Sequence, residues 1–160
     1  MNKVPLLYSS TMATSIAYTT VWDPTTSHPF NDETRERVGA IVYDVLGKLL
    51  IVEGGGGKMS LPKGCRFFGE TVWDGGIREL YEETGLDIEA LLADKSAKFV
   101  GSKQLRWGTY NVFQLKMRGT DLALRPQAGE TCKVLWRDPK SQWMQRKADL
   151  NADLRHLVKG

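Results

Sequence analysis

The stretch that decides the fold runs from residue 64 to residue 86 and reads GCRFFGETVWDGGIRELYEETGL. A helix turns about every 3.6 residues, so three glutamates at spacing i, i+3 and i+4 share one helical face: Glu79, Glu82 and Glu83. Carboxylates this close repel one another unless a cation binds there, and hard divalent cations take oxygen ligands. The same spacing also fits a solvated acidic face with an ordinary ion pair between Arg78 and Glu82. Three glutamates alone leave both interpretations open.

The wider spacing favours the first interpretation. The pattern G-x5-E-x7-R-E-U-x-E-E-x-G-U, with U a bulky aliphatic residue, matches the chain at every position from Gly64 to Leu86. Seven specified residues at average usage would coincide by chance on the order of once in 10^8 windows. This stretch resembles the signature of the Nudix hydrolases, a family that cleaves diphosphate linkages with the help of divalent metal ions.

The resemblance implies a role for each position of the signature. The metal, Mg²⁺ or Mn²⁺, would be held by the carbonyl of Gly64 and by three carboxylates: Glu79, Glu82 and Glu83. Glu70 would pair with Arg78 and hold the preceding loop against the helix. Water would attack phosphorus, with a carboxylate of this set or a metal-bound hydroxide as the base. Some family members use a further glutamate from a later loop, for which Glu130 is the candidate here; an exposed loop acid is the alternative.

Substrate choice depends on residues outside the signature. The glycine run 54–57 leads into Leu61-Pro62-Lys63-Gly64, and Arg37 opens the preceding strand. These features resemble the branch that acts on diphosphoinositol polyphosphates and diadenosine polyphosphates. The resemblance to the branch is incomplete, because Lys58-Met59-Ser60 stands where an aromatic residue often precedes Leu-Pro. The four glycines themselves fit either a close approach to ligand or a plain hairpin tip.

A ligand with many phosphates needs many cations around it, because each phosphate must be matched when it leaves water. The candidate substrate-binding residues are basic and lie near the signature: Arg37, Lys58, Lys63 and Arg66. Three more could lie nearby: Lys103, Arg106 and Lys133. Scattered surface lysine and arginine are the alternative explanation in a chain with 26% charged residues.

Three functions are therefore open. The favoured one is hydrolysis of diphosphoinositol polyphosphates, ahead of diadenosine polyphosphates. A messenger-RNA decapping enzyme is the second, although 160 residues at a net charge of +3 leave little room for a basic RNA channel. The third is a non-catalytic module that binds a metabolite. The intact carboxylate set favours catalysis, because an unused cluster of like charges is costly.

Length and composition indicate one folded domain. With 41% hydrophobic residues, 160 residues are enough for a sizeable core. We expect the hydrolase domain at 31–160, after a leader over 1–30 that is partly extended or flexible. No apolar run is long enough for a membrane span or a signal peptide, so we expect a soluble, cytoplasmic protein without membrane partners. The two cysteines, Cys65 and Cys132, are too few for a disulfide framework.

The order of elements resembles the Nudix fold, an α/β/α sandwich around a mixed β-sheet. Apolar runs at 37–43 and 49–53 around a Gly-containing turn predict a hairpin. The signature helix is expected over 72–84, with Gly85 as its left-handed stop and the loop 65–71 before it, packed over Phe67 and Phe68. The remaining chain predicts a connection over 88–95, a second hairpin of 99–105 and 110–117, a strand over 131–137 and a terminal amphipathic helix over 141–158.

Overall fold

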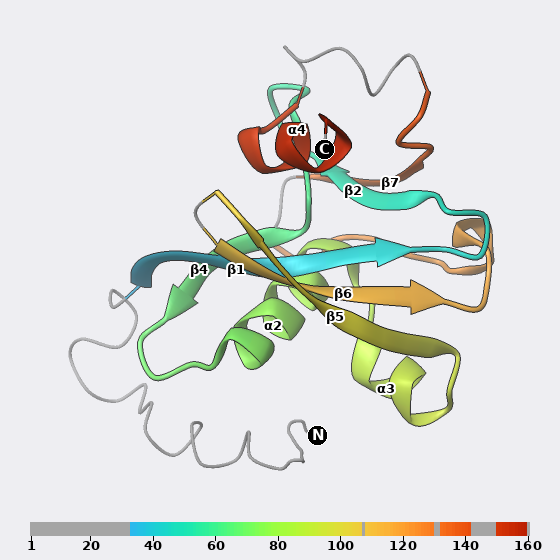
Figure 1. Ribbon diagram of the computed structural model, residues 1–160, viewed down its shortest axis with the longest axis horizontal. Coiled ribbons are helices and arrows are strands. Elements are labelled where there is room, and N and C mark those ends of the chain that lie inside the picture. Colours follow the sequence, from blue (N-terminus) through green and yellow to red (C-terminus); the bar gives the residue numbers. More distant parts are fainter. Residues whose placement is uncertain (1–32, 107, 130–131, 142–149, 160) are drawn as a thin grey trace.

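The computed structural model describes residues 33–106, 108–129, 132–141 and 150–159. Within these ranges a mixed sheet has the strand order β3-β2-β1-β6-β5, with β4 beside β1 and β7 beside β2 (Figure 1). The expected leader over 1–30 and the candidate base Glu130 lie outside the described residues. Among the described residues, no helix is long and apolar enough to cross a membrane.

The centre of the sheet is the parallel pair of β1 and β6, and the other described pairings are antiparallel. Val38, Ala40, Ile41 and Val42 of β1 are all at most 1% exposed. Such a continuous apolar run is typical of a strand that is covered on both faces. The strands are β1 (Glu33–Tyr43), β2 (Leu49–Glu53), β3 (Met59–Ser60), β4 (Lys63–Phe67), β5 (Ala97–Leu105), β6 (Gly108–Leu115) and β7 (Lys133–Arg137).

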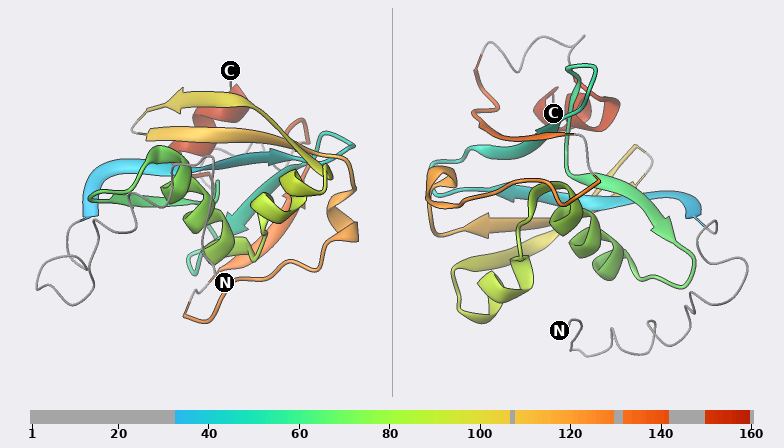
Figure 2. Two further views of the ribbon diagram at one scale, coloured as in Figure 1. Left: turned by 90° about the horizontal axis from the view of Figure 1, so that it is seen from below. Right: turned by 180° about the vertical axis from the view of Figure 1, so that it is seen from behind.

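Helices cover the two faces of this sheet, as Figures 1 and 2 show. On one face, α2 (Val72–Thr84) and α3 (Ile88–Ala93) pack Leu80 and Ile88 into a core with Val42 and Phe113. On the other face, α4 (Ala152–Lys159) packs Leu154 into a second core with Ile41 and Tyr110. The predicted α/β/α architecture is therefore confirmed. We call these surfaces the α2 face and the α4 face.

The signature helix has the predicted bounds. Thr71 caps the start of α2, since its side chain accepts a hydrogen bond from the Asp74 amide, and Gly85 ends it with φ 75°. Two glycines inside the helix allow close packing on the sheet: a Cβ at Gly75 would lie 2.8 Å from Val38, and one at Gly76 would lie 2.8 Å from the Gly39 carbonyl oxygen. This packing offsets the cost of about 1 kcal/mol for each helical glycine.

Four expectations about local structure were wrong. Part of the loop 65–71 belongs to β4, because the extended strand β1 pairs with Lys63–Phe67. Phe68 does not pack under that loop but is 61% exposed. The connection 88–95 contains a short helix, α3, whose start is capped by the Asp87 side chain.

The fourth correction concerns the terminal helix, which was expected over 141–158. Leu150 forms a parallel bridge with Met59, and the amide of Asn151 donates to the Met59 carbonyl at 2.7 Å. Because this contact fixes an extended backbone, α4 begins only at Ala152. Residues 142–149 of the predicted helix lie outside the described part of the chain.

Candidate functional site

Arg78 is the centre of the charged network on the α2 face. Its Nε and Nη2 donate to the two carboxylate oxygens of Glu70 at 2.6 and 2.9 Å, and Nη2 also donates to the carbonyl of Cys65 at 3.1 Å. The guanidinium carbon lies 3.8 Å from the centroid of the Phe67 ring. Since the side chain of Glu70 is 2% exposed, this two-pronged pair compensates an almost fully buried carboxylate. The pair joins the β4–α2 loop to the helix.

The remaining nitrogen of Arg78 contacts two glutamates of the signature. Nη1 lies 3.1 Å from Oε1 of Glu82 and 3.4 Å from Oε1 of Glu79. Burial alone would lower the pKa of Arg78, but the hydrogen bonds and charge of Glu70, followed by the charges of Glu79 and Glu82, raise it above its ordinary value. Two signature carboxylates therefore meet at one cationic nitrogen.

Strand β4 positions two further members of the expected metal site: Gly64, which belongs to the strand, and Glu83, which the strand contacts. The amide of Lys63 donates to Oε1 of Glu83 at 3.0 Å. The carboxylate of Glu79 lies against the α-carbon of Gly64, so closely that a Cβ at position 64 would overlap it. Any residue other than glycine there would push the Glu79 carboxylate aside. β4 thus contacts two of the signature glutamates of α2, with Gly64 against Glu79 and the Lys63 amide on Glu83.

This donor set fits a hard divalent cation by its chemistry. The three carboxylates and the backbone carbonyl are all oxygen donors, which Mg²⁺ and Mn²⁺ prefer, and a cationic nitrogen already lies between two of them. In the described ranges, however, no three Asp, Glu, His or Cys side chains lie close enough together to hold a metal ion as they stand. Full coordination would therefore require Glu79 and Glu82 to exchange Arg78 for the metal.

Of the predicted basic residues, two lie on one face of the sheet and a third is bonded to other residues. Arg37 lies opposite Cys65, and Lys63 lies opposite Gly39, in the pairing of β1 with β4. Because opposite residues of an antiparallel pair share a face, Arg37 and Lys63 are on the α4 face, whereas Gly64 is on the α2 face. Arg66 is occupied elsewhere, since it donates to Glu36 at 2.7 Å and to the Glu70 carbonyl at 2.7 Å.

The glycine run forms the exposed tip of the hairpin between β2 and β3. The amide of Gly54 donates to the Lys58 carbonyl at 3.0 Å, and a Cβ at Gly55 or Gly56 would meet nothing within 4 Å. Lys58 is exposed at this tip. The hairpin-tip interpretation of the glycines is therefore the one that the described structure supports.

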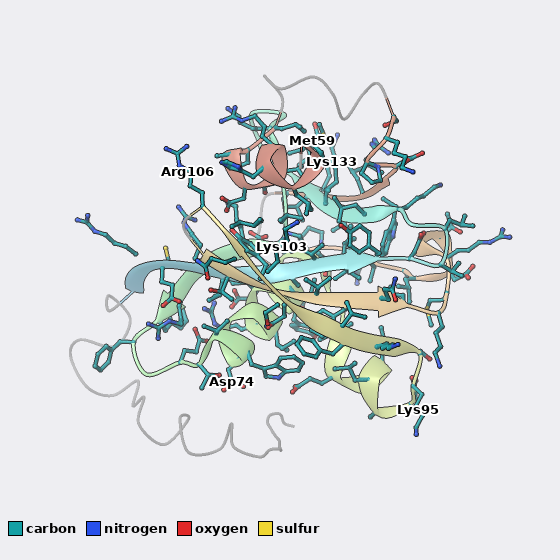
Figure 3. All side chains as sticks on the ribbon, viewed as in Figure 1. Met59, Asp74, Lys95, Lys103, Arg106 and Lys133 are labelled. Atoms are coloured by element: carbon teal, nitrogen blue, oxygen red, sulfur yellow. The ribbon has the colours of Figure 1, made fainter. Side chains whose placement is uncertain are left out.

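The three further basic candidates do not form one patch. Lys103 belongs to β5 and Arg106 to the turn after it, whereas Lys133 pairs with Glu53 at the edge formed by β7 (Figure 3). Glu53 in turn pairs with Met59, so Lys133 lies toward the start of α4. By the alternation of side chains, Lys103, opposite Tyr110 on β6, and Lys133, two residues before Leu135 of the α4-face core, both lie on the face of Arg37 and Lys63, but their strands β5 and β7 do not pair with each other.

Sequence reasoning missed a buried polar pair on the α4 face. The hydroxyl of Tyr110 donates a short hydrogen bond to Oδ2 of Asp153, and burial together with that carboxylate raises the pKa of Tyr110 well above its ordinary value. Asp153 is 3% exposed. One signal could have found it: Asp153 follows Leu150 by three positions and precedes Leu154, so it shares the apolar side of the predicted helix.

The chain resembles known proteins over most of its length. The NUDIX domain family model matches residues 33–157. Nudix hydrolase 5 of Arabidopsis thaliana is 31% identical over 127 residues, which are 73% of this chain and 41% of that protein. Nudix hydrolase 10 of the same plant is 30% identical over 141 residues, which are 81% of this chain and 47% of that protein. The chain thus spans less than half the length of these curated relatives.

Solved structures share the fold. A Deinococcus radiodurans protein superposes with a TM-score of 0.59 at 22% identity, over 86% of this chain and 85% of its own. An Ap4A hydrolase of C. elegans superposes with a TM-score of 0.58 at 16% identity, over 78% of this chain and 93% of its own. With a family match over 33–157 and the complete signature from Gly64 to Leu86, this chain belongs to the Nudix family.

Proposed function

We propose that this protein is a metal-dependent hydrolase that cleaves a diphosphate linkage in a small molecule carrying several phosphates. The observation that carries the proposal is that Glu79 and Glu82 contact the same cationic nitrogen of Arg78, and that Glu79 lies against Gly64. The backbone amide of Lys63, the residue before Gly64, donates to Glu83. A site that gathers carboxylates around a positive charge suits a divalent cation and the phosphate oxygens it would bind.

In the proposed reaction the residues of this site have three different roles: metal binding, support of the helix and proton acceptance. Glu79, Glu82, Glu83 and the Gly64 carbonyl would hold Mg²⁺ or Mn²⁺, which when bound neutralises charge on phosphate oxygens and makes water a better nucleophile. The pair of Glu70 and Arg78 fixes the helix against β4, so the glutamates keep their positions. A carboxylate of this set would accept the proton from the attacking water, and Glu130 stays a second candidate for that role.

The proposed substrates are diphosphoinositol polyphosphates, with diadenosine polyphosphates second. The support is the Leu61-Pro62-Lys63-Gly64 run before the helix and the two basic residues on the α4 face of β1 and β4, Arg37 and Lys63. Each could pair with a phosphate as it leaves water. Because Arg66 is held by Glu36, it would serve a substrate only by exchanging that partner.

The test measures phosphate release with Mg²⁺ or Mn²⁺ from diphosphoinositol polyphosphate, diadenosine polyphosphate and capped RNA. We expect turnover of the inositol substrate, and a loss of at least about 100-fold in Glu82→Gln, because a metal ligand is removed. Glu89→Gln on α3 is the matched control, since it neutralises a helical glutamate outside the signature.

Each other outcome assigns a different function. Turnover of the dinucleotide alone would move the protein to that substrate class, and release of the cap nucleotide alone would make it a decapping enzyme. Tight binding of one compound without turnover would make it a metabolite-binding module. A Glu82→Gln variant as active as the Glu89→Gln control would contradict the proposed metal site.

A further inference from the structure

Lys63 connects the two faces of the sheet. Its backbone amide donates to Glu83 of the signature helix at 3.0 Å, on the α2 face. Its side chain lies on the α4 face, because Lys63 is opposite Gly39 in the pairing with β1. Among the described residues the Lys63 ammonium makes no ion pair within 4.0 Å. A half-buried ammonium in this position is costly unless something accepts its hydrogen bonds.

An unused acceptor lies on the same face. Asp153 is 3% exposed, and while Tyr110 donates to its Oδ2, its Oδ1 is buried and meets no hydrogen-bond partner in the described part of the chain. Native proteins rarely leave a buried carboxylate oxygen without a partner. Asp153 cannot easily turn away, since Asn151 is bonded to Met59 and Leu154 is fully buried.

The arrangement of the sheet brings the ammonium and the acceptor together. Gly39 is opposite Lys63 on one side and beside Tyr110 on the other. Because Gly39 has no side chain, the space above it is left to its neighbours, and a Cβ there would lie 2.8 Å from Cβ of Lys63. Tyr110, whose hydroxyl donates to Asp153, therefore lies next to Lys63 across the position of Gly39.

We propose that Asp153 is an internal counter-ion for Lys63: rotation of the lysine side chain brings its ammonium to the unpartnered Oδ1 of Asp153 when no substrate is bound, and a substrate phosphate takes the ammonium from it. The flexible stem of lysine allows this change of partner by rotation about its own bonds. The release to phosphate rests on the proposed function, whereas the pairing does not. A substrate must then outcompete Asp153, which favours ligands that present several phosphate charges at once.

The pairing is tested by a double-mutant cycle on thermal unfolding, without metal or ligand. The proteins are wild type, Lys63→Met, Asp153→Asn and the double variant. We expect the Tm of the double variant to exceed the additive value by about 3 °C, because each single substitution already breaks the pair. Losses that add to within about 1 °C would overturn the pairing.

Arg37 provides the matched control, because it is the other basic residue on this face of β1. The cycle of Arg37→Met with Asp153→Asn should show clearly less coupling than the cycle with Lys63, since the charge of Arg37 also acts on Tyr110, the partner of Asp153. Coupling in that cycle and none with Lys63 would overturn the assignment of the cation. If Asp153→Asn does not fold, Tyr110→Phe replaces it in the cycle. Without the tyrosine hydroxyl, Asp153 has Lys63 as its remaining proposed partner. Lys63→Met should therefore lower Tm more in the Tyr110→Phe background than in wild type. An equal loss would overturn the proposal.

The release step is tested on whichever substrate the wild type hydrolyses. Asp153→Asn should lower KM several-fold with kcat within about twofold, since an occupied lysine reduces apparent affinity. In the Lys63→Met background, adding Asp153→Asn should leave KM unchanged. A gain that persists without Lys63 would be general electrostatics and would overturn the release step. If no substrate is hydrolysed, the proposed function fails while the unfolding cycle still decides the pairing.

Discussion

The two faces of the sheet beside β4 treat their charged groups differently. On the α2 face, Arg78 reaches three carboxylates and a carbonyl, and the buried Glu70 has both oxygens bonded. On the α4 face, the buried Asp153 has one oxygen bonded and the other without a described partner. A fully satisfied polar network is rigid and specifies one arrangement, whereas an unsatisfied buried group is open to exchange. We therefore infer that the α2 face holds the signature helix and its glutamates in place, whereas Asp153 on the α4 face can take the further partner proposed above.

The largest effect is expected where the satisfied network is broken at its centre. Arg78→Met should lower the free energy of unfolding by about 3–5 kcal/mol, because the almost fully buried Glu70 loses its only two-pronged partner among the described residues. Urea unfolding followed by circular dichroism would measure the loss.

Arg66→Met is the matched control for this substitution. Arg66 also donates to Glu70, but to the backbone carbonyl of Glu70 and not to its carboxylate. The ion pair of Arg66 is with Glu36, whose side chain is 38% exposed. Such a pair contributes about 1 kcal/mol or less. Equal losses in the two arginine variants would show that the α2 face is not organised around Arg78.

An intermediate effect separates the support of the helix from its chemistry. Gly76→Ala should cost about 1–3 kcal/mol, because its new Cβ would meet the Gly39 backbone carbonyl, which cannot move without shifting β1. The Gly64→Ala variant has a new Cβ whose three nearest atoms all belong to the carboxylate of Glu79, the far end of a side chain. Its unfolding free energy should therefore change by less than about 1 kcal/mol, while Mn²⁺ affinity falls about 10- to 100-fold.

Calorimetric unfolding and titration with Mn²⁺ would measure the two quantities. Gly55→Ala serves as the control for both, since nothing lies within 4 Å of its new Cβ. Unchanged Mn²⁺ affinity in Gly64→Ala would argue against Glu79 as a ligand. A large loss of stability in the same variant would argue that Gly64 supports the fold rather than the site.

Local sequence was sufficient to predict the helix α2 and the side of it that carries the signature glutamates. The bounds of α2 follow from Thr71 and Gly85, which act on backbone groups a few residues away, and the signature spacing places its glutamates on one side. The hairpin of β5 and β6 likewise follows from short-range alternation. The family and the α/β/α fold predicted from these features were confirmed.

The α4 face could not be predicted in this way, because its contacts join residues far apart in the chain. Tyr110 and Asp153 are 43 positions apart, and Met59 meets Leu150 across the sheet. The start of α4 is set by that second contact and not by the amphipathic pattern, which continues through it. β4 was missed for the same reason, since it depends on how far β1 extends toward its start.

The smallest effect concerns a carboxylate on α2 that is bonded by Thr71 and not by Arg78. Burial raises the pKa of Asp74 to about 6, against the lowering effect of its hydrogen bond with Thr71. Since the folded protein then keeps this proton more tightly than the unfolded chain, stability falls as pH rises from about 4 to 6. Asp74→Asn should match wild type near pH 4 and exceed it by up to about 1 kcal/mol above pH 6, a value kept low by partial solvent screening.

Asp94, after α3, should show the opposite sign. The hydrogen bonds of Ser96 lower the pKa of its carboxyl, so the folded protein favours its ionised form and Asp94→Asn should lose stability relative to wild type as pH rises. Thermal unfolding from pH 3.5 to 8 measures both variants under the same conditions. If both curves moved in the same direction, Asp74 would not be desolvated, and carboxylates on the α2 face would be tolerated without Arg78. Divergent curves would instead show that burial disfavours the charge of Asp74, which Arg78 does not contact.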